Sequence, residues 1–169
     1  MRRILRRREL VQDDWRHLGE EGADAQSSGE SALIVPFAEF RAHGDQWRAY
    51  QGRLGVRLSP ADAVEDLAGD IQRFSLVACE FPTPGEGRGY TQGRLLRSRL
   101  KFTGELRAVG AAVKQDLLFI MSRCGFDSFE LAAGQNVDEA RKALDRYTVA
   151  YQPAVEVPAI QQQRFFAAG

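Results

Sequence analysis

The sequence predicts an α/β fold of repeated βα units around a mainly parallel sheet of about six strands. Short apolar runs alternate with segments of helical periodicity, and successive runs start roughly 20 to 30 residues apart, as in βα units. The central runs ALIVPF and LVACEF are almost continuous in apolar residues. This is typical of parallel strands that are buried on both faces.

The individual elements follow from these patterns in chain order. Strands are predicted at 32–37, 55–59, 75–81, 105–110, 128–132 and, more weakly, 148–152. Helices are predicted between them at 38–49, 61–70, 90–100, 111–124 and 136–145. The second helix follows Ser59-Pro60, an N-cap residue with proline at the first helical position, and the fourth ends at Gly125, a residue typical of helix C-termini. Six strands are too few for a complete eightfold barrel, so we expect an open sheet or an incomplete TIM-like barrel closed by a homodimer.

The two ends of the chain differ in composition from its centre. The start, MRRILRRREL, lacks the apolar segment of a secretory signal, so we interpret it as a basic first strand or arm before the ordered segment DDWRHL. Residues 19–31 are small, polar and acidic, which predicts a flexible loop. We therefore expect an arm and loop at 1–31, a single α/β domain at 32–152, and a C-terminal tail at 153–169.

Composition excludes several classes of function. The 169 residues carry 23 Lys and Arg against 23 Asp and Glu, whereas a general nucleic-acid binder usually has a basic excess. No apolar run is long enough to span a membrane. Cys79 and Cys124 lie in apolar surroundings without a CxxC spacing, which favours buried thiols and a cytoplasmic location.

The longest loop at the carboxyl ends of the predicted strands is TPGEGRGYT, residues 83–91. Its glycines allow close approach of a ligand, and the following helix N-terminus offers free amides to an anion. Arg88, Gly89 and Tyr90 are therefore candidate anion-binding residues, although a flexible loop with an incidental arginine explains the pattern equally well. In the helix that follows, Arg94 and Arg97 share a face, which is either a solvated surface or a partner-docking surface.

The run ELRAVG places Glu105 and Arg107 on one face of a buried strand. A buried charge without a partner is strongly destabilising, so Arg107 requires a carboxylate. Glu105 can supply it along the strand, and Asp116 or Asp127 across the fold. The alternative is that Arg107 points into a ligand pocket.

Two further residues, Gly110 and Arg123, complete the candidate site. Gly110 ends this strand at the edge where ligands of α/β sheets bind. Arg123 precedes Cys124 and could lower the pKa of its thiol, although an inert buried thiol is the simpler interpretation. With His17 and His43 far apart and no P-loop, dinucleotide, HExxH or CxxC motif, we expect no metal site and no cofactor.

Several segments carry a family resemblance. GRGYT, RLLRSR, FTGELRAVG, DLLFIMSRCGFDSFEL and YTVAYQ, together with DDWRHL, resemble the bacterial family called domain of unknown function 934. The resemblance extends from Asp13 to Gln152 and is densest from Arg88 to Leu131. The chain departs from the family pattern at Glu86, where the family has aspartate, and at Ala111, where it has aspartate or asparagine. The pair Gln115-Asp116 is inverted. If the missing acidic position were catalytic, Ala111 would weaken an enzymatic role.

Members of that family are encoded beside assimilatory sulfite reductase, which implies a role in reducing sulfite to sulfide for cysteine synthesis. We expect an accessory protein, acting as an adaptor, assembly factor or electron-transfer partner of sulfite reductase or its electron donor. The alternative is a small (β/α) enzyme or sensor that binds an anionic sulfur compound or a phosphorylated metabolite at the carboxyl ends of the strands.

Overall fold

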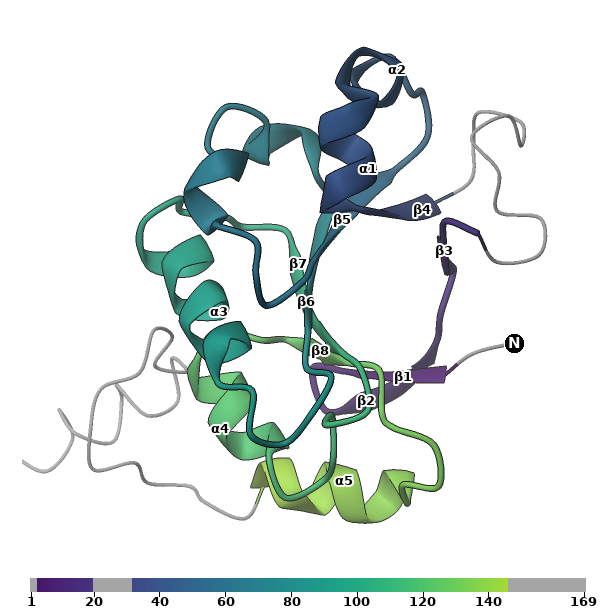
Figure 1. Cartoon of the computed structure of the whole chain (residues 1–169). Helices are drawn as coiled ribbons and strands as arrows, with labels where there is room; N and C mark the ends of the chain where they lie inside the picture. Colours follow the sequence, from purple (N-terminus) through teal and green to yellow (C-terminus); the bar gives the residue numbers. More distant parts are fainter. Residues whose placement is uncertain (1–2, 20–31, 146–169) are drawn as a thin grey trace, which may run out of the picture.

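The computed structural model describes residues 3–19 and 32–145, which form a mixed α/β fold with a curled, mostly parallel sheet (Figure 1). The α-helices of this part of the chain are α1 (Phe37–Ala42), α2 (Gly44–Arg48), α3 (Arg88–Ser98), α4 (Leu118–Arg123) and α5 (Val137–Asp145). Two 3₁₀ helices, η1 (Val64–Leu67) and η2 (Ile71–Arg73), stand between β5 and β6. None of the helices in the described ranges is long and apolar enough to cross a bilayer.

The sheet has eight strands within the described residues, in the order β2-β1-β8-β7-β6-β5-β4-β3. Their bounds are β1 (Arg3–Arg6), β2 (Glu9–Gln12), β3 (Trp15–His17), β4 (Ala32–Pro36), β5 (Leu54–Leu58), β6 (Leu76–Glu80), β7 (Glu105–Val109) and β8 (Ser128–Phe129). Strands β3 to β8 pair in parallel, whereas β1 is antiparallel to both β8 and β2.

Both edges of this sheet come from one short stretch of chain, residues 9–17, which we call the closing segment. Its first part is β2, which pairs with β1, and its last part is β3, which pairs with β4. Only Asp13 and Asp14 separate the two parts. The chain therefore runs directly from one edge to the other, which requires the sheet to curl until its edges approach each other.

The two faces of the sheet bury different groups, because side chains alternate along each strand. All helices that contribute to the main core pack on the outer face, through residues such as Phe40, Leu96 and Met121 (Figure 1). The inner face has a smaller apolar cluster around Trp15. The Trp15 ring lies 3.2 Å from the position that a Cβ would occupy on Gly55, so glycine on β5 makes room for the indole.

The structure corrects the predicted strand count of six. Residues 3–17, expected as a strand or arm, supply three strands, whereas the weak strand expected at 148–152 lies outside the described residues. Of the two expected architectures, the open sheet is wrong because the sheet is curled. The curled sheet instead has the form of an incomplete barrel.

Regular βα repetition also fails in two units. The helix expected at 61–70 is replaced by the two short 3₁₀ helices η1 and η2, and before them Asp62 accepts hydrogen bonds from the amide and hydroxyl of Ser59 at 2.7 and 2.8 Å. The helix expected at 111–124 is α-helical only from Leu118 to Arg123.

Candidate functional site

An ion network occupies the inner face of the sheet, with Arg107 of β7 at its centre. The Arg107 side chain has no exposed surface, and neither has that of its partner Asp13 in the closing segment. Arg107 Nη1 donates to both Asp13 carboxylate oxygens, at 3.0 and 2.9 Å. Its Nε and Nη2 donate to Glu105 Oε1, at 3.0 and 2.7 Å. Of the two alternatives for Arg107, the structure thus contains the internal ion pair.

The same network reaches the neighbouring strands through Glu105. Ser128 Oγ donates to Glu105 Oε1 at 2.7 Å, and Arg6 Nη1 approaches Oε2 at a longer 3.4 Å. Sequence reasoning named Glu105 as a partner but missed Asp13, which lies 94 residues away along the chain. Two features of the sequence could have indicated Asp13 as a partner. A buried arginine needs more than one acceptor, and the segment DDWRHL begins with two acidic residues.

Arg97 of α3 does not lie on the solvated face expected for it beside Arg94. Its side chain is only 7% exposed and donates to Asp127 Oδ2 at 3.0 Å and to the carbonyl oxygens of Gly125, Phe102 and Gly104. A Cβ on Gly125, whose φ is +103°, would lie 2.6 Å from Arg97 Cγ. Gly125 therefore ends the turn after α4 and leaves space for this guanidinium to enter.

The glycine-rich loop at 83–91 lies on the other side of the sheet from Arg107. Arg88 is exposed at the start of α3, and its amide donates to Glu86 Oε1 at 3.1 Å, so the chain places its own carboxylate at this helix N-terminus. Gly89 packs against Phe81, whose ring would lie 2.6 Å from an added Cβ, and Tyr90 contacts the same ring edge-on. The structure therefore does not bring Arg88 and Tyr90 together with Arg107.

Gly110 has a structural role beyond the end of β7. Its φ is +113°, and a Cβ would lie 2.6 Å from the carbonyl oxygen of Phe81. That oxygen accepts a hydrogen bond from the amide of Ala112, and the Phe81 amide donates to Val109. Glycine at this position allows the loops after β6 and β7 to cross closely.

Cys124 lies where α3 meets the end of α4. Burial raises the pKa of its thiol, while the positive charges of Arg94 and Arg123 act in the opposite direction. Burial also raises the pKa of Tyr90, with smaller contributions from Cys124 and the exposed Asp116. Tyr90, Arg94, Ile120, Arg123 and Cys124 together form what we call the α3–α4 surface. Cys79, by contrast, is enclosed in the core, which raises the pKa of its thiol.

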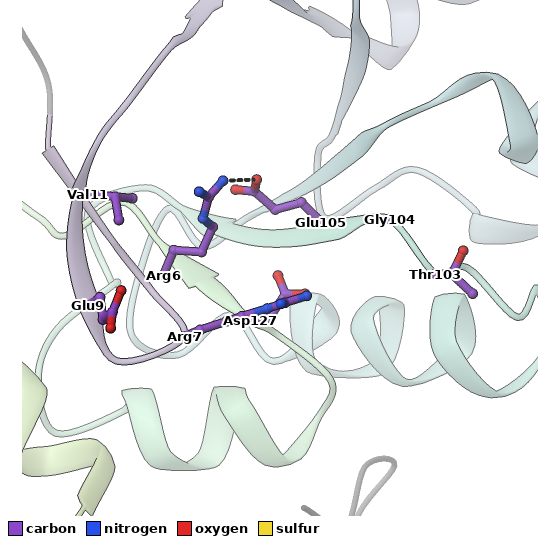
Figure 2. Close-up of a pocket in the computed structure, with 8 residues that line it drawn as sticks. All are labelled: Arg6, Arg7, Glu9, Val11, Thr103, Gly104, Glu105 and Asp127. Carbon is purple, nitrogen blue, oxygen red and sulfur yellow. Dashed lines mark hydrogen bonds and ion pairs between the residues drawn. The ribbon is translucent and has the colours of Figure 1, made fainter.

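A pocket of about 370 Å³ lies at the amino ends of β7 and β8, beside the turn between β1 and β2 (Figure 2). The hairpin contributes Arg6, Arg7, Glu9 and Val11, residues 103–105 at the start of β7 form a second side, and Asp127 completes the lining. Burial raises the pKa of the Asp127 carboxyl despite the opposing effect of Arg97. The pocket is thus lined by charges of both signs.

The carboxyl ends of the strands carry a second polar group on the inner face. His17 Nε2 and Glu130 Oε2 are 3.1 Å apart. Arg57 of β5 and Glu80 of β6 are half-buried there, and neither forms an ion pair within the described residues. In the same ranges, 3–19 and 32–145, no three His, Cys, Asp or Glu side chains are grouped in a way that could hold a metal ion.

The comparison with known families gives one match. A family profile described as "bacterial protein of unknown function (DUF934)" matches residues 55–161, more than half of the chain. The chain belongs to this family. The match covers Arg107, Arg97 and Asp127, whereas the closing segment and β4 precede it. A search of curated proteins found no significant match.

The ion network predicts a large stability effect from a single substitution. Replacing Arg107 with Met leaves the carboxylate of Asp13 buried without its counterion, so we expect the free energy of unfolding to fall by about 3–5 kcal/mol. Urea unfolding followed by circular dichroism measures this change. The matched control is Arg99→Met, which removes an exposed ion pair with Glu65 and should cost less than about 1 kcal/mol. Equal losses in the two variants would contradict the central role of Arg107.

Two aspartates have pKa values that are shifted in opposite directions, so they should titrate at different pH. Burial raises the pKa of Asp127 above its ordinary 3.8, whereas the hydrogen bond from Arg48 lowers the pKa of Asp70. The folded state therefore holds the Asp127 proton more tightly than the unfolded state does. As pH rises from 3.8 through the raised pKa, the contribution of Asp127 to the free energy of unfolding falls. Asp70 contributes stability above 3.8 that is lost as pH falls through its lowered pKa. Carboxyl ¹³C NMR titration measures both pKa values, and the midpoint of Asp127 should lie above that of Asp70. A midpoint of Asp70 above that of Asp127 would refute these two shifts.

Proposed function

We propose that the protein is an accessory protein of assimilatory sulfite reduction, and that it docks on sulfite reductase or its electron donor through the α3–α4 surface. The family resemblance, densest from Arg88 to Leu131, supports the pathway. The observation that supports docking is Ile120, a large apolar side chain that is 51% exposed on α4. Within residues 3–19 and 32–145 the other exposed large apolar side chain is Leu10, at 40%.

The charges around Ile120 favour an acidic partner. Arg94 on α3 is exposed and forms no ion pair with any described residue, and Arg123 lies on α4 near Cys124. An apolar centre beside arginine side chains is typical of protein interfaces, in which arginine and large apolar residues are enriched. A negatively charged surface on the partner complements such a patch and accelerates association.

Several exposed arginines of the fold are compensated by neighbouring carboxylates. Arg99 bonds Glu65 at 2.6 Å and Arg48 bonds Asp70 at 2.9 Å. Arg94 differs from them, and so does Arg88 at the start of the same helix, whose guanidinium has no partner in the described chain. Two exposed arginines that form no ion pair with a described residue, Arg88 and Arg94, thus lie on α3. In this proposal the protein works in the reducing cytoplasm, which agrees with its free thiols.

A second candidate function rests on the carboxyl ends of the strands. The half-buried Arg57 and Glu80, near the His17–Glu130 pair, favour a small (β/α) enzyme or sensor that binds an anionic sulfur compound or phosphorylated metabolite. Arg57 would hold the anion, while His17 and Glu130 are groups suited to proton transfer. Loss of function in Arg57→Gln with partner capture intact would favour this candidate over docking.

The docking proposal is tested by genetic complementation. A deletion strain should fail to grow on sulfate or sulfite as the only sulfur source and should grow on sulfide or cysteine. The double variant Arg94→Glu/Ile120→Asp should fail to restore growth on sulfite, because it reverses the charge and removes the apolar centre of the α3–α4 surface. The folded variant should also fail to capture sulfite reductase or its electron donor, whereas the wild-type chain should capture one of them.

The matched control is Arg141→Glu, which reverses an exposed charge on α5 and should restore growth fully. Normal growth of the deletion strain on all four sulfur sources would refute the pathway. Full complementation by a folded Arg94→Glu/Ile120→Asp variant would refute the docking surface but leave the pathway intact.

A further inference from the structure

The pocket beside the β1–β2 hairpin plays no part in the proposed docking, and its lining supports a separate inference. Its volume of about 370 Å³ falls in the range of small-molecule sites. It lies at the amino ends of the parallel strands, away from both the α3–α4 surface and the carboxyl-end polar group.

The acidic wall of the pocket already has buried counterions. Glu105 is bonded to Arg107, and Asp127 is bonded to Arg97, from inside the fold. Each carboxylate therefore has a counterion from inside the fold, in addition to the positive charge of Arg6 near Glu105 and of Arg7 near Asp127. The hairpin thus brings two more guanidinium groups to the same pocket.

Those two guanidinium groups are weakly engaged. Arg6 is 44% exposed and reaches Glu105 only at 3.4 Å, a long distance for a charged hydrogen bond. Arg7 extends along the pocket toward Asp127 in Figure 2, and its guanidinium donates no hydrogen bond within the described residues. Both arginines are therefore available to an anionic group of a ligand.

The turn of the hairpin has a strained backbone, and this conformation directs the Arg7 side chain toward the pocket. The φ angles of Arg7 and Arg8 are +48° and +70°, a left-handed conformation that asparagine and glycine adopt far more readily in two-residue hairpin turns. The Arg7 amide donates to the carbonyl oxygen of Asp127 at 2.9 Å, which fixes the turn against the start of β8. Strain of this kind is commonly retained where a side chain has a function.

From these contacts we propose that the pocket binds a small zwitterion of the α-amino-acid class. The carboxylate of the ligand lies between Arg6 and Arg7, and its ammonium group faces Glu105 and Asp127. A simple oxyanion pairs with the arginines but is repelled by the two carboxylates. A simple amine pairs with the carboxylates but is repelled by the two arginines. Only a ligand with both charges matches both walls.

NMR titration of the full chain tests this proposal, with the amides of Thr103 and Gly104 as local reporters. The probes are L-alanine, L-serine and L-glutamate, with acetate, methylammonium and sulfate as single-charge comparisons, each up to about 10 mM. We expect at least one amino acid to shift the reporters saturably, and the single-charge ions to bind at least about tenfold more weakly.

The decisive variant is Arg7→Asn, because asparagine tolerates the left-handed turn while it removes the guanidinium. We expect the variant to fold with unchanged or higher stability and to bind the amino acid at least about tenfold more weakly. The control Arg3→Gln, on the same hairpin but outside the pocket, should bind normally. Absence of binding by all three amino acids, equal binding of acetate or sulfate, or unchanged binding by Arg7→Asn would overturn the proposal.

Discussion

The buried contact between Arg107 and Asp13 is the interaction on which the arrangement of this fold depends. It joins the middle of β7 to the closing segment, whose two parts form both edges of the sheet. A fully enclosed guanidinium must be satisfied on all sides, and a curled sheet with acids on its inner face achieves this. Buried polar contacts of this kind contribute more to a unique arrangement than to net stability, since partners other than the native one leave a charge unpaired.

This constraint leaves three regions of the molecule outside the buried network, namely the two ends of the strands and the outer helices. The centre of the inner face is occupied by the Arg107 network, whose charges satisfy one another. The pocket forms at the amino ends, where the hairpin meets Asp127. On the outer face, Arg97 turns inward to hold the segment before β7, whereas Arg94 of the same helix stays exposed near Cys124.

The sequence predicted the elements that depend on local pattern and missed those that depend on distant contacts. The apolar runs located β4 to β7 within one or two residues, and helical spacing located α3. The strands of residues 3–17 were less predictable, because they are short, their arginines and Glu9 stay exposed, and no continuous apolar run marks them. Helical periodicity assigned Arg97 to the solvated face, since nothing local indicates that Gly125 leaves room for it. Asp13 could be inferred only as an unnamed acid, and the pocket required Arg7 in a left-handed conformation.

The most direct test of this account is native-state hydrogen exchange of the closing segment. The Trp15 amide of this segment donates to Asp13 Oδ1 at 3.2 Å, and the Leu18 amide, directly after the segment, donates to the carbonyl oxygen of Ile34 at 2.9 Å. If the segment is an integral part of the sheet, these amides should exchange only through global unfolding, with the same protection as amides of β6 and β7. Exchange of Trp15 and Leu18 at rates typical of a freely opening arm, while β7 stays protected, would contradict the account.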